Sequence, residues 1–232
     1  MTARAIVSVV IPAYNEERFI GELLDRVRRV DLSPVKCALE LIVVDDGSKD
    51  RTAEIVAAIP NVTLLRKANG GKGSAGRAGI GAATGDYVLI QDADLEYDPN
   101  DYVPMLAALR QGATVVYGSR YLAHRKPYPQ QGLMAFLGGT SLSLVCWMLT
   151  GRYLTDTVTA LKLFPRTLLT GLALETSGFE LDHEITAKVI ARGHDIVEVP
   201  IRYYPRSRLD GKKIGARDWL IAVRTFARWR RG

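Results

Sequence analysis

The order of apolar and polar positions divides the first part of the chain into alternating strands and helices. Residues 5–11 form a β-branched apolar run ended by Pro12, as expected of a parallel strand buried on both faces. Residues 16–30 carry apolar side chains at helical spacing, with Arg and Glu between them. The alternation then predicts strands at 39–44, 62–66 and 87–91 and helices at 50–58 and within 69–85. Such alternation predicts an α/β fold with a doubly wound, mostly parallel sheet in three layers, α/β/α.

Beyond Pro99 the pattern is less regular. It predicts helices at 102–110 and 181–192 and strands at 114–117, 160–164 and 196–204. Residues 132–151 carry no charge and are numerous enough to span a bilayer. Small and polar residues within this run dilute its hydropathy, so we favour a buried or membrane-surface helix over a spanning one.

Composition places the chain among ordinary globular proteins. Its 232 residues are 47% hydrophobic and 24% charged, enough for one domain with a sizeable core. Cys37 and Cys146 lie far apart without metal-ligand spacing, which predicts buried or incidental thiols. The N-terminal residues are typical of a strand rather than a signal peptide, so we expect a cytoplasmic protein.

The positive charge is concentrated at the C-terminus. The chain has a net charge of +6, yet residues 202–232 alone contain ten Lys or Arg against two Asp, so the remainder is slightly acidic. We therefore expect one catalytic domain over 1–204 and a basic segment over 205–232. A basic segment can meet nucleic acid, an anionic membrane or phosphorylated substrates. The motif context of nucleic-acid readers is missing, which argues against the first.

Asp92-Ala93-Asp94 is the sharpest candidate site. Two carboxylates one residue apart at a strand end can share Mg²⁺ or Mn²⁺, cations that usually complete their shell with substrate phosphates. Glu96 could add a third oxygen. An Asp-rich turn is the alternative for the triplet alone. Its position after a strand favours a ligand site, because ligands of such sheets bind at the carboxyl ends of strands.

Asp45 and Asp46 end another predicted strand. An acid at this position can accept hydrogen bonds from a ribose or a nucleobase, whereas Asp50 suits the cap of the next helix. Gly70-Gly71-Lys72-Gly73 is similar to a phosphate-binding loop without the spacing of known fingerprints, so a plain flexible turn stays open.

Later charged residues supply further candidates. Phosphate contacts suit Arg and Lys side chains, here Arg120, Arg206, Arg208, Lys212 and Lys213. A base near an acceptor would be a carboxylate or His, here Asp156, Glu180, Asp182, His183 or Glu184. Solvated surface charges and acids near a helix N-terminus are the respective alternatives.

Taken together, these segments resemble the inverting family-2 glycosyltransferases, in particular the polyprenyl- or dolichyl-phosphate sugar synthases. The resemblance covers nearly the whole chain in order. It rests on residues 9–16, 43–48 with Asp50-Arg51-Thr52, Asn69-x-Gly71-Lys72-Gly73, 91–96, 118–121, 155–157, 162–164, 178–180 and 197–201. It implies a GT-A-like fold.

The resemblance also implies roles for individual residues. Those expected to bind the nucleotide sugar are Pro12, Tyr14, Glu16, Val44, Asp46, Lys72, Asp92, Ala93, Arg120, Arg206 and Lys212. Those expected to hold the metal are Asp92, Asp94 and Glu96, and the catalytic pair would be Asp94 and Asp156. Relatives often carry Gln in place of Glu96 and Ser-Gly-Phe in place of Thr159-Ala160-Leu161, so the chain departs from the family at these positions.

The implied reaction is inverting transfer of a hexose from a GDP- or UDP-sugar to a polyprenyl phosphate, with a divalent cation stabilising the leaving diphosphate. A phosphate acceptor arrives ionised, so Asp156 would orient it more than deprotonate it. Two alternatives stay open. One is a soluble transferase acting on a saccharide or protein, and the other is a non-catalytic nucleotide-sugar-binding module.

A lipid acceptor would give the apolar and basic segments a common purpose. Residues 132–151 and the basic end with Trp219 and Trp229 could lie at the surface of an anionic membrane. We therefore expect peripheral attachment to the cytoplasmic face, alone or with a separate membrane subunit.

Overall fold

The computed structural model describes residues 4–124, 126–128, 131–205 and 216–231. Four of the predicted phosphate ligands lie outside these ranges, namely Arg206, Arg208, Lys212 and Lys213. The strands are β1 (Ala5–Ala13), β2 (Cys37–Asp45), β3 (Val62–Arg66), β4 (Tyr87–Ile90), β5 (Val115–Ser119), β6 (Lys162–Pro165) and β7 (Ile196–Pro200). The helices are α1 (Ile20–Arg28), α2 (Thr52–Ala57), α3 (Lys72–Ala82), α4 (Tyr102–Arg110), α5 (Leu133–Thr150), α6 (Arg166–Gly171), α7 (Leu181–Ala191) and α8 (Ala216–Trp229).

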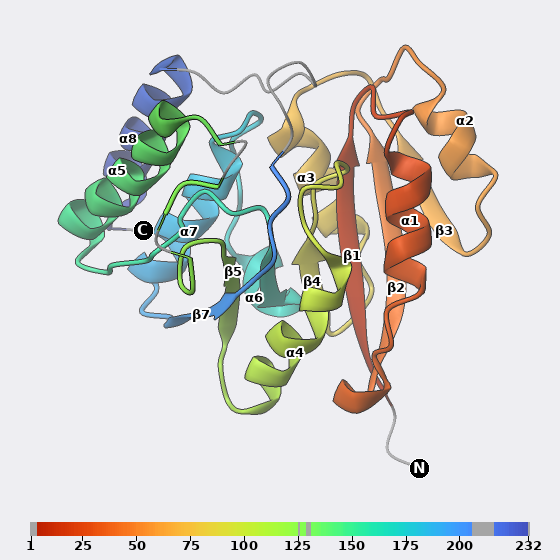
Figure 1. The fold of residues 1–232 in the computed structure, drawn as a ribbon, viewed down its shortest axis with the longest axis horizontal. Coiled ribbons are helices and arrows are strands. Elements are labelled where there is room, and N and C mark those ends of the chain that lie inside the picture. The colour runs from red at the N-terminus through yellow and green to blue at the C-terminus, as the bar shows by residue number, and fades with distance from the viewer. Residues whose placement is uncertain (1–3, 125, 129–130, 206–215, 232) are drawn as a thin grey trace.

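The described strands form one seven-stranded sheet in the order β3-β2-β1-β4-β6-β5-β7. All neighbouring pairs are parallel except those of β6, which runs antiparallel to both β4 and β5. The expectation of a mostly parallel, doubly wound sheet is therefore confirmed. Its parallel strands all end at the same edge of the sheet, toward which β1 and β2 run upward in Figure 1.

Alternation along the strands builds a core on each face of the sheet. In β1, Val7, Val9 and Ile11 face the layer of α1, α2 and α4, while Val10 faces the layer of α3, α6 and α7. All four residues are fully buried. The central strands are apolar on both sides because helices cover both faces. Figure 1 shows α1 and α4 in front of the sheet and α6 and α7 behind it.

The last described helix, α8, packs along α5 and α7 rather than on the sheet. Cys146 of α5, Ala187 of α7 and Phe226 of α8 are fully buried and form a third, small core with Trp229. Trp219 of α8 also donates a hydrogen bond from Nε1 to Ser141 Oγ at 2.9 Å. The basic end of the chain therefore contributes to a packed unit, and the proposed boundary after residue 204 stays a prediction.

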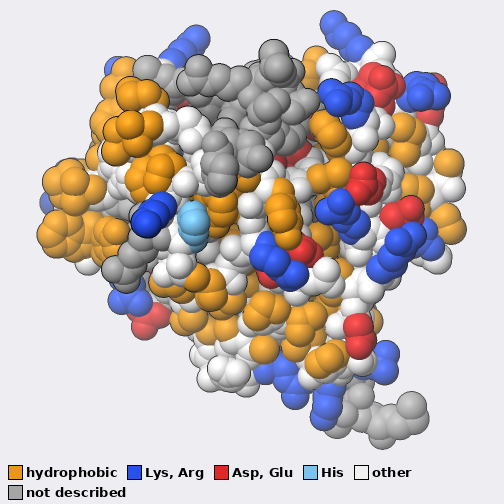
Figure 2. Space-filling view, in the orientation of Figure 1, with side chains coloured by type: hydrophobic (Ala, Val, Ile, Leu, Met, Phe, Trp, Pro, Cys, Tyr) orange, Lys and Arg blue, Asp and Glu red, His pale blue; other side chains and the backbone are white. Residues whose placement is uncertain are grey.

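α5 leaves one apolar face uncovered. Among the described residues, it is the single helix long and apolar enough to cross a membrane, although here it packs against α7 and α8. Its outward face carries large side chains that are 47–74% exposed, namely Leu133, Met134, Leu137, Leu144, Trp147 and Met148. Figure 2 shows hydrophobic side chains gathered on this side of the molecule.

Candidate active site

The predicted site residues meet at the carboxyl edge of the sheet, as expected. β1 lies between β2 and β4, so the loops that follow these three strands are neighbours. Ala13 pairs in register with Asp45, and Val10 pairs with Ile90. Asp46 directly follows β2, and Asp92 lies two residues beyond the end of β4. Residues far apart in sequence therefore meet at this carboxyl edge, which we call the rim.

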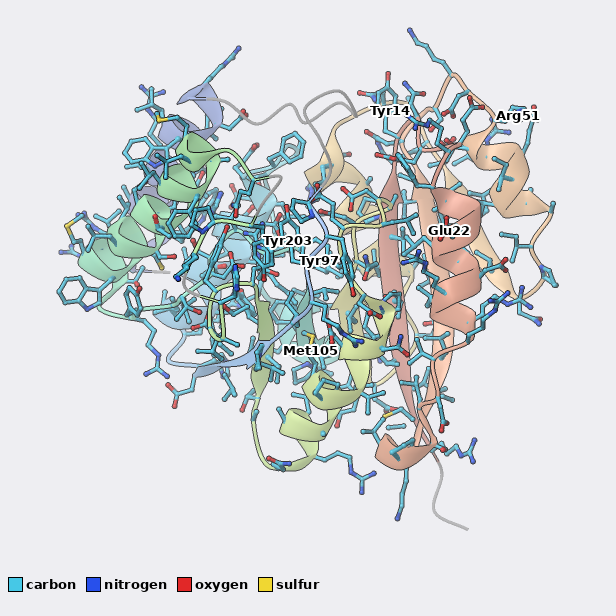
Figure 3. All side chains as sticks on the ribbon, in the orientation of Figure 1. Tyr14, Glu22, Arg51, Tyr97, Met105 and Tyr203 are labelled. Atoms are coloured by element: carbon cyan, nitrogen blue, oxygen red, sulfur yellow. The ribbon has the colours of Figure 1, made fainter. Side chains whose placement is uncertain are left out.

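Two loops at this rim are tied together by hydrogen bonds. The Asn15 amide donates to Ser48 Oγ at 2.9 Å, and the Glu16 amide donates to Thr52 Oγ1 at 2.8 Å. Asn15 has a positive φ of 55°, which turns the chain sharply after β1. Tyr14 is left 38% exposed at the upper edge of the molecule in Figure 3. Two loops fixed to each other beside an exposed aromatic ring provide a surface on which a nucleobase can stack.

Asp46 organises the loop before α3. Its carboxylate accepts hydrogen bonds from the amides of Gly70 and Gly71 and from Lys67 Nζ, at 3.0, 2.7 and 2.6 Å. The sequence suggested that Asp46 binds the nucleoside, whereas in this structure it holds the loop. Its contact with a nucleoside stays a prediction. Asp50 was expected to cap the next helix, but the N-cap position of α2 is Arg51, and no side chain caps it. Asp50 lies one residue earlier, where its Oδ1 accepts from the Thr52 amide at 2.9 Å.

The glycines at 71 and 73 allow another backbone to approach α3. A Cβ at Gly71 would lie 2.6 Å from the carbonyl oxygen of Ser177, and one at Gly73 would lie 2.7 Å from that of Gly178. The Ser74 amide donates to the same Ser177 oxygen at 2.9 Å. Gly71 also has a φ of +93°, which disfavours any side chain there. These glycines therefore join the start of α3 to the segment before α7.

Lys72 lies among carboxylates at this junction. Its Nζ is 2.7 Å from Asp92 Oδ1 and 3.5 Å from Asp182 Oδ2. Burial works to lower the pKa of Lys72, but the charges of Asp92 and Asp182 outweigh it and raise the pKa above its ordinary value. Lys162, with a fully buried side chain, approaches Asp182 Oδ1 to 2.8 Å. Burial alone would raise the pKa of Asp182, yet Lys162 and Lys72 bring it down to about 2.

Asp94 and Glu96 lie on the turn after β4. The Glu96 amide donates to Asp94 Oδ1 at 3.2 Å, and Glu96 Oε2 accepts from the Tyr203 hydroxyl at 3.0 Å. The Tyr203 ring packs beside Tyr97, with ring centroids 5.5 Å apart, in the centre of Figure 3. This packing connects the turn to the segment after β7.

Among the residues that the structure describes, no group of three His, Cys, Asp or Glu is arranged to hold a metal ion. Asp92, Asp94 and Glu96 do not form such a group in this structure, where Asp92 pairs with Lys72 and Glu96 accepts a hydrogen bond from Tyr203. The donor set nevertheless fits a hard cation: Mg²⁺ and Mn²⁺ are commonly held by one or two carboxylates together with substrate phosphates. Asp92 and Asp94 supply such oxygens, whereas the role of Glu96 stays a prediction.

Arg120 and Asp156 form a buried pair below the rim. Arg120 Nε and a terminal nitrogen donate to the two oxygens of Asp156 at 2.6 and 2.7 Å, and the Arg120 amide adds a third bond at 3.1 Å. Asp156 is 1% and Arg120 8% exposed. Burial would lower the pKa of Arg120, but the Asp156 charge raises it. Asp156 is thus bound to a cation through both oxygens, which disfavours the role of a base and leaves an orienting role as the prediction.

Glu198, from β7, supports this pair and was missed from the sequence. It accepts hydrogen bonds from the amides of Thr155 and Asp156, at 2.8 and 3.0 Å, and from the Thr155 hydroxyl at 2.8 Å. Burial raises the pKa of Glu198 above its ordinary value. Lys162 and Tyr203 were also missed as site residues. In the sequence, Glu198 and Lys162 stand out only as single charged residues within apolar strands. Nothing in the sequence marks Tyr203 as a site residue.

The other predicted ligands differ in how accessible they are. Pro12 and Glu16 are partly exposed at the rim. Val44 is fully buried and Ala93 only 4% exposed, so both support the rim from beneath in this structure. Their contacts with a nucleotide stay predictions.

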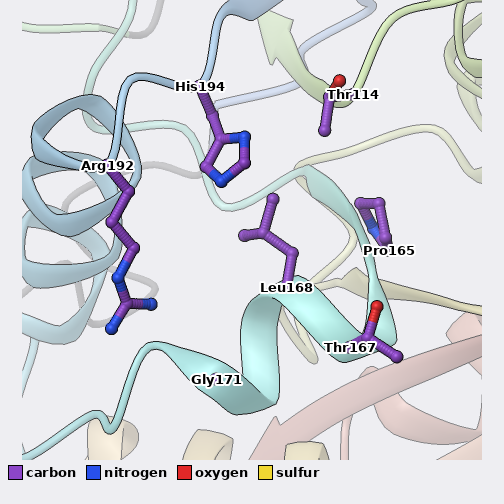
Figure 4. Close-up of a pocket in the computed structure, with 7 residues that line it drawn as sticks. All are labelled: Thr114, Pro165, Thr167, Leu168, Gly171, Arg192 and His194. Carbon is purple, nitrogen blue, oxygen red and sulfur yellow. The ribbon is translucent and has the colours of Figure 1, made fainter.

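A pocket of about 430 Å³ lies away from this rim. Thr114 precedes β5 and Pro165 ends the antiparallel β6, so the pocket is at the opposite edge of the sheet (Figure 4). Its remaining lining residues are Thr167, Leu168, Gly171, Arg192 and His194. None of the predicted site residues lines it.

Solved structures share this fold. Glucosyl-3-phosphoglycerate synthase from Mycobacterium tuberculosis, solved with UDP, matches with a TM-score of 0.69 and 22% sequence identity, covering 96% of this chain and 80% of that one. The same protein solved with Mn²⁺, UDP-glucose and phosphoglyceric acid also gives a TM-score of 0.69. At this identity the likeness shows the GT-A-like fold.

Related sequences include the dolichol-phosphate mannosyltransferase of Pyrococcus furiosus, 29% identical over 240 aligned residues that cover 96% of this chain and 64% of that protein. The undecaprenyl-phosphate 4-deoxy-4-formamido-L-arabinose transferase of Pseudomonas aeruginosa is 38% identical over 117 residues, 48% of this chain and 34% of that protein. The chain thus spans less than two thirds of the length of these relatives.

The profile of Glycosyl transferase family 2 matches residues 8–166, more than half of the chain. The protein therefore belongs to glycosyl transferase family 2.

Proposed function

We propose that the protein transfers a hexose, with inversion, from a nucleoside diphosphate sugar to a polyprenyl phosphate, in a reaction that depends on Mg²⁺ or Mn²⁺. Two relatives are named as transferases of dolichol phosphate and undecaprenyl phosphate. A structural neighbour was solved with Mn²⁺ and UDP-glucose. These names support the acceptor class and the donor class respectively.

The pairing of the site carboxylates is the observation that carries the choice of acceptor. Asp156 is bound to Arg120 through both oxygens, and Asp182 is bound to Lys162 and Lys72. A general base must be able to take a proton from the acceptor, and a carboxylate whose two oxygens already accept from bound cations is poorly placed to do so. An acceptor phosphate is already ionised, so it needs orientation rather than deprotonation.

The donor would lie along the rim from Tyr14 to Lys72. Tyr14 would face the base, and the ammonium of Lys72 would neutralise diphosphate oxygens close to Asp92. A divalent cation held by Asp92 and Asp94 would stabilise the charge of the leaving diphosphate. Arg120, held by Asp156 through Nε and one terminal nitrogen, would donate its remaining N–H groups directly to the acceptor phosphate.

Attachment to an anionic membrane on its cytoplasmic face is part of this proposal. The exposed apolar face of α5 would enter the headgroup region of the lipid. On the neighbouring α8, Arg217, Arg224 and Arg228 are exposed and would meet anionic headgroups. A surface that combines apolar and cationic side chains is suited to a substrate that resides in the bilayer.

Release of nucleoside diphosphate tests the proposed function. Purified protein is incubated with GDP- and UDP-hexoses and Mn²⁺, and either a short-chain polyprenyl phosphate or a set of sugars is added as acceptor. Lipid-linked hexose formed from one donor, and only with the polyprenyl phosphate, is the expected result. Transfer to sugars alone would identify a soluble saccharide transferase. Intact donor in every mixture would contradict catalysis under these conditions and favour a binding module.

A further inference from the structure

Four charged side chains alternate in sign from the sheet interior to the rim. Lys162 Nζ lies 2.8 Å from Asp182 Oδ1, Asp182 Oδ2 lies 3.5 Å from Lys72 Nζ, and Lys72 Nζ lies 2.7 Å from Asp92 Oδ1. Each oxygen of Asp182 therefore serves one lysine. The side chains of the four become more accessible toward the rim, from 0% for Lys162 and 12% for Asp182 to 22% for Lys72 and 25% for Asp92.

Lys162 is the fixed end of this series. Its ammonium also approaches the Asp182 carbonyl oxygen to 3.4 Å and lies 5.2 Å from the centroid of the Tyr117 ring. Tyr117 is held in turn by a hydrogen bond of 3.0 Å to Thr186. With these partners on β5 and α7, Lys162 cannot change position without disturbing the core.

Lys72 is the adaptable end. Its ammonium lies at the tip of a flexible stem, with the centroid of the Phe179 ring 5.7 Å away. Without Asp182, Lys72 could choose among many rotamers, and a bound phosphate would have to order it. A carboxylate anchored on its far side removes much of that freedom before the ligand arrives.

A purely structural role explains this arrangement poorly. Replacing a buried ion pair with apolar residues of similar volume is often neutral or stabilising, so stability alone gives little reason for a buried lysine at this point. The pair formed by Lys162 and Asp182 carries no net charge. Its effect on a distant anion is therefore small, and its influence on the site has to pass through the side chain that it touches, Lys72.

We infer that Lys162 and Asp182 are positioning residues for the donor diphosphate: Lys162 fixes the Asp182 carboxylate, and Asp182 holds the Lys72 ammonium beside Asp92, where it meets the phosphates. This inference rests on the proposed function, in which the donor is a nucleoside diphosphate sugar. It gives Asp182 the role of a fixed anchor rather than a proton acceptor.

A double-mutant cycle tests the inference through binding. Isothermal titration calorimetry measures the affinity for UDP and for GDP, each with Mn²⁺, in the wild type, Lys72→Met, the double variant Lys162→Met with Asp182→Asn, and the triple variant. The double variant replaces the ion pair with neutral groups of similar size, so no buried charge is left alone. Thermal unfolding of each variant shows whether it is folded.

We expect Lys72→Met and the double variant each to weaken binding about tenfold, the usual effect of losing one charge-assisted contact. In the Lys72→Met background, removal of the pair should change affinity by less than about twofold, because the pair then has nothing to position. Unchanged affinity in the double variant would overturn the inference. An equal loss in both backgrounds would overturn it as well, since the pair would then act without Lys72.

Two further variants keep the test decisive. Asp182→Glu retains the charge but moves the carboxylate by one methylene, so it should weaken binding in the wild-type background and have no effect with Lys72→Met. This variant decides the question if the double variant does not fold. The control replaces the other buried pair of α7, Lys188→Met with Glu184→Gln, whose atoms lie 2.6 Å apart. A loss in this control as large as that in the double variant would overturn the inference.

Failure of the proposed function has a separate signature. If the folded wild type binds neither UDP nor GDP in the presence of Mn²⁺, both the donor class and this inference are wrong. If it binds one of them and the cycle is additive, only the inference is wrong.

Discussion

At the carboxyl edge of the sheet charged side chains are buried in pairs, whereas the outward face of α5 leaves large apolar side chains in solvent. Asp156 is 1% exposed and bound to Arg120, while Met134 and Met148 of α5 are 74% and 63% exposed. The two regions reverse the usual distribution of polar and apolar groups in a globular protein.

The helix α7 connects the two regions. Asp182, in its first turn, faces Lys162 and Lys72 at the site, and the next residue, His183, packs against Phe226 of α8 with ring centroids 5.2 Å apart. Side chains are therefore held rigidly where charge must be positioned, whereas apolar surface stays exposed where a partner can cover it. Substitutions in each region should therefore affect different properties.

The largest expected effect is on catalysis at the rim. We expect Asp94→Ala to lower kcat by at least about a thousandfold, because it removes an oxygen ligand that is needed only while charge develops on the diphosphate. Nucleoside diphosphate release with Mn²⁺ measures this loss, and thermal unfolding checks the fold. The matched control is Asp25→Ala on the exposed side of α1. Activity close to that of the control would contradict a metal role for Asp94.

The next effect is on stability. Arg120→Met leaves the Asp156 carboxylate buried without its cation, so we expect the free energy of unfolding to fall by about 3–5 kcal/mol. Urea denaturation measures the change. Arg26→Met, which breaks the exposed pair with Glu22, should cost less than about 0.5 kcal/mol. Similar losses for the two variants would remove the distinction between buried and exposed pairs.

A third effect concerns pH at the contact between the two regions. Burial, together with the nearby charge of Lys162, lowers the pKa of His183 from 6.5 to about 4. The folded state therefore binds fewer protons than the unfolded state between these values. Stability should be highest above about pH 6.5 and fall by about 3 kcal/mol as the pH drops to about 4. Urea denaturation at several pH values measures this loss.

The variant His183→Phe isolates that contribution. It keeps an aromatic ring against Phe226 but cannot be protonated, so the difference in stability between variant and wild type should change with pH over this range. A constant difference from pH 7 to pH 4 would contradict the titration of His183.

The smallest expected effect lies on α5. Met134→Glu with Met148→Glu places charges on its exposed face and should weaken sedimentation with anionic liposomes about tenfold, because apolar burial is lost and anionic lipid repels the new carboxylates. Nucleotide binding should be unchanged. The control Val197→Glu replaces a 40% exposed side chain on β7. Equal sedimentation of wild type and α5 variant would require the membrane part of the proposal to be abandoned.

Much of the fold could be predicted from the sequence because it depends on local patterns. The strand at 62–66 and the helix at 102–110 were predicted with the bounds that the structure shows, and most other elements differ by a few residues at their ends. Three features were not predicted. The helix α8 lies in the segment that was described only as basic, the short helix α6 has little periodic signal, and the antiparallel direction of β6 depends on its insertion between β4 and β5.

The site follows the same division. The placement of Asp46, Asp92 and Asp94 after parallel strands was readable from the sequence, because successive strand ends in such a sheet share one edge. The side chains that pair with buried charges at this site could not be predicted. Lys72 and Asp182 are 110 residues apart, and Arg120 and Asp156 are 36 apart. No local sequence pattern predicts which of two such distant residues will form an ion pair.

The alternation of strands and helices, the doubly wound sheet and the acidic rim follow from local sequence patterns, since hydrophobic period and turn residues act over short distances. Long-range packing sets which charges neutralise each other. It also lets Asp46 hold the loop before α3 and leaves α5 with an exposed apolar face while it packs on α7 and α8. These outcomes depend on which distant segments come into contact. Because burying an unpaired charge costs several kcal/mol, each buried charge must meet a partner of opposite sign.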